Sequence, residues 1–142
     1  MDEAALHALE TYRFPGGTRT LAQWENHLLA DATESAPMPD GLAHPVAAFN
    51  LSIQGAGTSI AELFDRCEVA DAGAVWLEAY DWDFAHPLRE EVEYRLSGGI
   101  DTAERGKTRS GRTFDRVVFS VDIDEPTGDR AVRATTTWRI HR

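Results

Sequence analysis

Cysteine is nearly absent from this 142-residue sequence, because Cys67 is the only one. A single cysteine cannot form an internal disulfide, and its place in an apolar helical repeat indicates a small buried side chain rather than a nucleophile. Long hydrophobic runs are missing as well, since no apolar stretch approaches the ~18 residues that a membrane span needs. The first residues, Met1 to Leu6, carry acids where a signal peptide carries basic residues. We therefore expect a cytoplasmic protein that is neither exported nor inserted into a membrane.

Basic residues are scarce too, with 14 Lys and Arg against 24 Asp and Glu and a formal net charge of -10. Such a surface repels phosphates, so a nucleic-acid partner is not expected. The segment Arg105 to Arg112 is an exception, because it packs four cations into eight residues. It is either a solvated hairpin tip or a contact for the phosphates of a carrier or coenzyme. The five histidines lack metal-ligand spacing with acids or Cys67, so no metal or other cofactor is expected.

The length is that of one domain, and we expect residues 1–142 to form it. Residues 10–14 indicate a short strand or extended lead-in that ends in the turn cluster Pro15-Gly16-Gly17. Thr20 and Gln23 form a capping-box pattern ahead of an amphipathic helix over about residues 21–34. Two prolines and a glycine then predict a loop over residues 35–41.

Two consecutive helices are predicted next, over about Pro45 to Gly55 and Ile60 to Arg66. Proline is well tolerated at a first helical position, and Ser59 with Glu62 forms a second capping box. The segment from Pro45 to Gly55 carries no charge and is apolar or small nearly all round. Such a helix is usually buried.

The C-terminal half changes its period from helical to alternating. Four runs alternate apolar and polar side chains, at about residues 76–84, 92–96, 117–123 and 132–140. The connections, including Gly98-Gly99, are too short for crossover helices, so the strands should pair antiparallel with one covered face. We expect an α+β fold in which a long buried helix is wrapped by a curled antiparallel sheet of about five strands.

The order of these motifs resembles the MaoC-like (R)-specific hydratase/dehydratase family, which has the hot-dog fold. The resemblance covers about residues 20–142 and is carried by the run from Ala43 to Phe49, by Trp82 to Arg89 with its Pro-Leu-Arg corner, and by Tyr94. Gly111 to Asp115 and Thr137-Trp138 are similar to the N-terminal FAS1-type dehydratase domain. No single motif is specific, and their order carries most of the weight.

The resemblance implies a site at the start of the hot-dog helix. Family enzymes hydrate enoyl thioesters, or dehydrate the 3-hydroxy form, with an Asp and a His in a Gly-Asp-x-Asn-Pro-x-His stretch, because one group activates water while the other protonates carbon. The corresponding segment here lacks Asn-Pro-x-His. Asp31 stands near the acidic position, and His44 is the only histidine at the helix start, either as the catalytic partner or as a cap of that helix.

The same resemblance assigns the thioester carbonyl to backbone N–H groups of that helix. Pro45 has no N–H to give, so Val46 and Ala47 are the expected donors. Asn50 and Gln54 are expected either to orient a substrate water or to satisfy strand backbone. Trp82, in an aromatic strand with Trp76, Tyr80 and Phe84, belongs either to the core or dimer interface or to a flat pocket wall for a bulky acyl or polycyclic group.

We therefore predict a hydro-lyase component, resembling the degenerate half of two-part MaoC-like enzymes. The expected partners are an acyl-CoA or acyl-carrier thioester and a second hot-dog subunit, in a homodimer or a heterodimer. The alternatives are a non-catalytic acyl-thioester-binding or assembly module, an NTF2-like ligand-binding cone, and a hot-dog thioesterase.

Overall fold

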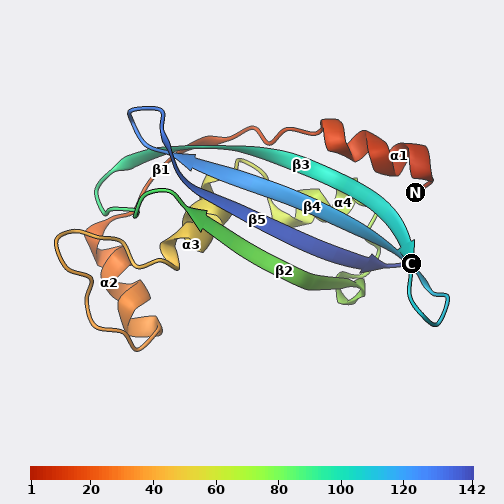
Figure 1. Ribbon diagram of the computed structural model, residues 1–142, viewed down its shortest axis with the longest axis horizontal. Helices are drawn as coiled ribbons and strands as arrows, with labels where there is room; N and C mark the ends of the chain where they lie inside the picture. The colour runs from red at the N-terminus through yellow and green to blue at the C-terminus, as the bar shows by residue number, and fades with distance from the viewer.

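The computed structural model describes residues 1–142 and consists of one antiparallel sheet with helices against it (Figure 1). The strands lie in the order β1-β3-β4-β5-β2, and the sheet does not close on itself. The predicted α+β fold with about five antiparallel strands is confirmed. No helix is long and apolar enough to cross a membrane. The elements are α1 (Glu3–Ala8), β1 (Gly17–Thr20), α2 (Gln23–Ala32), α3 (Ala47–Gly55), α4 (Ile60–Arg66), β2 (Val75–Phe84), β3 (Glu93–Lys107), β4 (Thr113–Asp124) and β5 (Arg130–His141), with short 3-10 turns at Leu9–Thr11 and Ala72–Ala74.

Helix α3 lies behind the sheet and packs on its concave face (Figure 1). Small side chains make this close packing possible, because Ala47, Ala48 and Gly55 are buried and a Cβ on Gly55 would lie 2.6 Å from the Leu96 side chain. The expected burial holds for this inner face alone. Phe49 is 40% exposed and Ile53 is 45% exposed, so the helix is not covered all round.

The core lies between these helices and alternate residues of the long strands. On β5, Ala134, Trp138 and Ile140 are buried, while their neighbours in the chain are more exposed. This is the alternation that the sequence predicts for a sheet covered on one face. The capping box of Ser59 with Glu62 is also confirmed at the start of α4.

Three local predictions are wrong. The first strand begins at Gly17, inside the predicted turn cluster, and α2 is capped at Ala22, whose N–H donates to the Glu25 carboxylate, rather than at Thr20. Strand β3 runs straight through Gly98-Gly99, where a connection was expected. The lead-in pairs antiparallel with β3 there, through the bridge between Arg13 and Gly99, and a Cβ on Gly99 would lie 2.6 Å from the carbonyl oxygen of Tyr12. Glycine in a strand marks close backbone approach here, not a turn.

Only part of the basic segment from Arg105 to Arg112 forms the predicted hairpin tip, because β3 continues to Lys107. Arg105 lies within β3 and donates two hydrogen bonds to Asp115, at 2.7 and 3.0 Å, and one to the Met1 carbonyl. Arg142 donates to the same carboxylate at 2.7 Å and to the carbonyls of Cys67 and Glu68. Asp115 is fully buried, so this cluster ties the two ends of the chain to the sheet.

Candidate functional site

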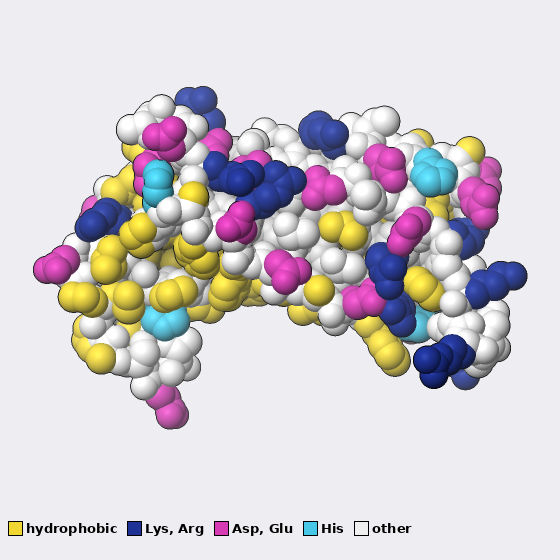
Figure 2. Space-filling view, viewed as in Figure 1, with side chains coloured by type: hydrophobic (Ala, Val, Ile, Leu, Met, Phe, Trp, Pro, Cys, Tyr) yellow, Lys and Arg dark blue, Asp and Glu magenta, His cyan; other side chains and the backbone are white.

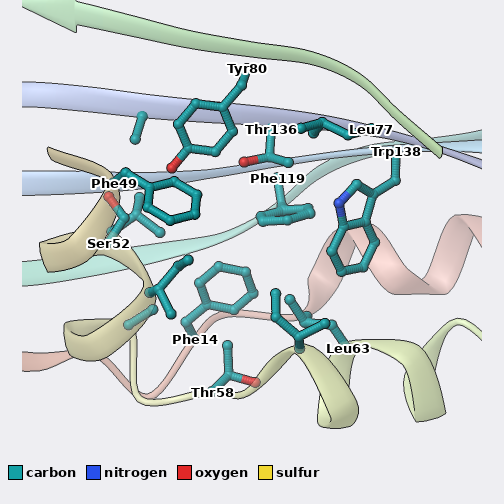
Figure 3. A pocket seen from close by; sticks show the side chains of 15 residues that line it. Phe14, Phe49, Ser52, Thr58, Leu63, Leu77, Tyr80, Phe119, Thr136 and Trp138 are labelled. Atoms are coloured by element: carbon teal, nitrogen blue, oxygen red, sulfur yellow. The ribbon is translucent and has the colours of Figure 1, made fainter. Parts of the chain in front are cut away.

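A cavity of about 260 Å³ opens between α3, α4 and the concave face of the sheet (Figure 3). It is bounded by residues that are far apart in the sequence, from the lead-in before β1 to strand β5. Most of its lining is hydrophobic, and none of it carries a formal charge. The lining residues are Phe14, Phe49, Ser52, Ile53, Ala56, Thr58, Ile60, Leu63, Leu77, Tyr80, Phe119, Val121, Ala134, Thr136 and Trp138.

Aromatic rings in edge-to-face contact form the walls. The ring of Phe119 lies 6.1 Å from that of Phe14 and 4.8 Å from that of Trp138, measured between centroids. On the other side, the rings of Phe49 and Tyr80 lie 5.4 Å apart and link α3 to β2. Such pairs are favoured by ring electrostatics and hold the walls in place. The pocket is therefore walled largely by aromatic rings that contact one another.

A few hydroxyl groups supply the polarity of the pocket. Figure 3 shows the hydroxyl of Tyr80 pointing toward α3, where Ser52 lies, with Thr136 on the neighbouring strand. The Ser52 hydroxyl donates to the Ala48 carbonyl at 2.7 Å, which leaves its oxygen free to accept. Burial raises the pKa of Tyr80, so its phenol stays neutral at physiological pH. An apolar pocket with a few fixed hydroxyls is suited to an uncharged ligand.

His44 lies at the start of the helical segment and is held by hydrogen bonds on three sides. Its backbone N–H donates to the side chain of the buried Asn26 at 2.8 Å. Its Nδ1 accepts from the Val46 N–H at 3.1 Å, so the neutral ring carries its proton on Nε2, which lies 3.3 Å from the Thr33 hydroxyl. These contacts agree with the alternative in which His44 caps the start of the helix.

Asp31 lies on the outer face of α2. Its carboxylate is 3.5 Å from Nε2 of His27, one helical turn earlier, and both side chains are more than half exposed. No hydrogen bond or ion pair joins Asp31 to His44. The structure therefore does not bring the two expected catalytic residues together, and their roles stay predictions.

The expected carbonyl donors are already used. The Val46 N–H donates to His44 Nδ1, and the Ala47 N–H donates to the His44 carbonyl at 2.9 Å. A bound thioester oxygen would have to replace these partners.

The other expected binding residues lie beside the pocket rather than in it. Asn50 is half-buried and Gln54 exposed on α3, and neither lines the cavity. Trp82 is also outside the lining, although its ring is 5.5 Å from that of Tyr80.

Sequence reasoning missed Ser52, Thr136 and Phe14 as pocket residues. Ser52 follows Phe49 by three positions and precedes Ala56 by four, so its place on the pocket side of α3 was available from helical spacing. Thr136 is brought opposite Tyr80 by the register between β5 and β2, which no local pattern indicates.

No protein-family model and no curated protein matches the sequence. Solved structures are similar in fold. A chain of the ChsH1-ChsH2 complex from Mycobacterium tuberculosis gives a TM-score of 0.72, with 9% identity over 97% of this chain and 89% of that chain. The HadBC (3R-hydroxyacyl-ACP dehydratase) complex from the same organism gives a TM-score of 0.63 with 15% identity over 90% and 93%. A MaoC-like dehydratase from Rhodospirillum rubrum gives 0.61 with 16% identity over 92% and 91%.

Identities this low show a shared fold and do not establish a shared activity. The structural similarity nevertheless extends over nearly the whole length of both chains in each pair. The chain has the hot-dog fold, and its structural neighbours include a MaoC-like dehydratase, an R-hydratase and a hypothetical thioesterase.

Proposed function

We propose that this chain is a MaoC-like subunit that shapes the acyl pocket of a two-part hydratase/dehydratase for acyl thioesters. The observation that carries the proposal is the 260 Å³ uncharged pocket beside α3, whose lining holds no Asp, Glu or His to serve as a general base. A partner hot-dog subunit supplies the acid/base pair in this proposal.

The pocket favours the acyl part of such a substrate over its carrier. Each buried CH₂ of an acyl chain contributes about 0.8 kcal/mol to binding, and the aromatic walls provide the surface against which it packs. The coenzyme or carrier part of an acyl thioester contains phosphates, which an uncharged and aromatic pocket does not accommodate. The acyl group enters the pocket, while the thioester stays at its mouth.

The helix start supports dependence on a partner. The His44 ring is hydrogen-bonded to the Val46 N–H and the Thr33 hydroxyl, and Asp31 is paired with His27 on the surface. Pro45 has no backbone N–H to donate. Two of the similar structures are complexes, ChsH1-ChsH2 and HadBC. That precedent favours a heterodimer with a related subunit for this chain.

The test is a hydration assay with crotonyl and longer enoyl thioesters, using the purified chain alone and together with a hot-dog subunit that retains Asn-Pro-x-His. We expect barely measurable turnover alone and a chain-length preference in the complex that depends on this subunit. Robust activity of the isolated chain would overturn the proposal, and its loss in Asp31→Asn or His44→Ala would make the substituted residue catalytic in this chain.

A non-catalytic acyl-binding module is the second candidate, and the same uncharged pocket favours it. Calorimetric titration with saturated acyl thioesters separates the two functions. Binding by the chain alone, with no effect on the rate of any catalytic subunit, would favour the binding module.

A further inference from the structure

Strand β2 is an open edge of the sheet. It pairs with β5 along its whole length, from Val75 to Phe84, and no strand lies on its other side. A free edge of this length exposes backbone N–H and C=O groups that pair readily with another strand.

The side chains next to this edge are apolar on the concave face. Leu77 is 62% exposed, Trp82 37% and Phe84 38%. Helix α3 reaches this strand through the ring contact between Phe49 and Tyr80. Figure 2 shows hydrophobic side chains gathered over α3 and the adjacent end of β2. The edge and its apolar face together form one continuous surface.

The charge of the same strand has a single sign. Residues 75–84 contain Glu78, Asp81 and Asp83 and no basic residue. Glu78 is neutralised by Arg116 at 3.0 Å and by Arg139. Asp81 has no ion pair, and Asp83, 78% exposed, lies 4.0 Å from Arg130. On the convex face, Asp81 therefore lacks an ion-pair partner, and Asp83 has only this long one.

This charge pattern works against a second copy of the chain. Two copies of β2 can pair antiparallel about a two-fold axis, with the concave faces of both sheets on the same side. If the axis passes through Asp81 or Asp83, that residue lies opposite its own copy. If the axis passes through Trp82, Asp81 of one copy lies opposite Asp83 of the other. If it passes through Tyr80, Asp81 lies diagonal to Asp81 of the other copy, at roughly 7–8 Å. Each of these four registers thus brings like charges together. The net charge of -10 on each copy adds long-range repulsion.

We infer that the β2 edge selects a different hot-dog subunit, whose edge strand carries Lys or Arg opposite Asp81 and Asp83. Apolar side chains of that strand cover Trp82 and Phe84 on the concave face. The inference rests on the proposed two-part assembly and adds the rule by which the partner is chosen. Opposite charges across the strands set register and partner, and the apolar face supplies buried area.

A charge exchange tests this rule with the chain alone. The variant Asp81→Lys/Asp83→Lys is mixed with the wild-type chain at micromolar concentration and low salt, and the mass is followed by light scattering. We expect each protein alone to be monomeric and the mixture to form a dimer, with a Kd at least about tenfold below that of either self-association. Added salt should weaken the mixed dimer, because these charges are exposed.

The matched control is Glu34→Lys/Asp65→Lys, which makes the same charge change at exposed sites away from β2. It should form no comparable dimer with the wild type. If the lysine variant does not fold, Asp81→Asn/Asp83→Asn replaces it and should self-associate, because the repulsion is gone.

A wild-type homodimer with an unchanged Kd in the asparagine variant would overturn the inference. So would a folded lysine variant that forms no mixed dimer. No thioester enters this measurement, so its failure is distinct from a failure of the acyl-pocket proposal.

Discussion

The Nδ1 atom of His44 accepts the backbone N–H of Val46 at 3.1 Å, so this side chain closes the first turn of the helical segment rather than facing the pocket. The same ring reaches the Thr33 hydroxyl and links α2 to α3.

His44→Ala should therefore act mainly on stability. Loss of a capping side chain costs about 1 kcal/mol in the free energy of unfolding. Asp31→Asn, on the exposed face of α2, should change it by less than about 0.5 kcal/mol. Urea titration measures both values. A loss of about 10²-fold or more in the rate of the assembled enzyme, at unchanged stability, would instead make His44 a catalytic residue.

Filling the pocket should change acyl-chain selection. Ala134 is buried and lines the cavity, and Ala134→Phe places a ring in it. We expect affinity for long acyl thioesters to fall about tenfold or more, with short ones less affected. Calorimetry with chains of several lengths measures this, and urea titration monitors the overpacking cost of about 1–3 kcal/mol. Ala61→Phe, on the exposed face of α4, is the control and should leave the length profile unchanged.

Asp115 should make stability depend on acid pH. Burial acts to raise its pKa, but the hydrogen bonds from Arg105 and Arg142 outweigh burial and hold the pKa below the usual 3.8. A carboxyl group with a lowered folded-state pKa contributes stability above its unfolded value and loses it as the pH falls through the folded value. The loss should therefore occur below about pH 4.

Asp115→Asn should cost about 3–5 kcal/mol at neutral pH, because it leaves two arginines without their buried carboxylate. The difference from the wild type should shrink in urea titrations below about pH 4. A constant difference between neutral pH and pH 3 would contradict this assignment.

The thiol of Cys67 should be unreactive in the folded protein. Burial raises its pKa to about 11, so almost no thiolate forms at pH 8. A chromogenic disulfide reagent should label it slowly in buffer and rapidly in denaturing urea. Rapid labelling of the folded chain would mean that the segment around the end of α4 opens readily.

The fold was more predictable than the site. Helical spacing and the Ser59 capping box placed α4 at its observed bounds, and strict alternation identified β2, β4 and β5 but only the first part of β3. Helix α1 was missed, because its six residues carry little periodic signal. The pocket depends on the register between β2 and β5, which shifts at a bulge between Leu77 and Ala79. Periodicity indicates which face a residue takes, but not which residue of another strand lies opposite.

The cluster around Asp115 also gives the molecule a mechanical property. Arg105 holds Met1, Arg142 is the last residue, and both termini lie at the same end of the sheet (Figure 1). A force applied between the two ends is therefore carried first by these hydrogen bonds and only afterwards by the strand pairs. Fusion partners or surface tethers attached at either terminus project from this end, away from α2 at the opposite end of the molecule.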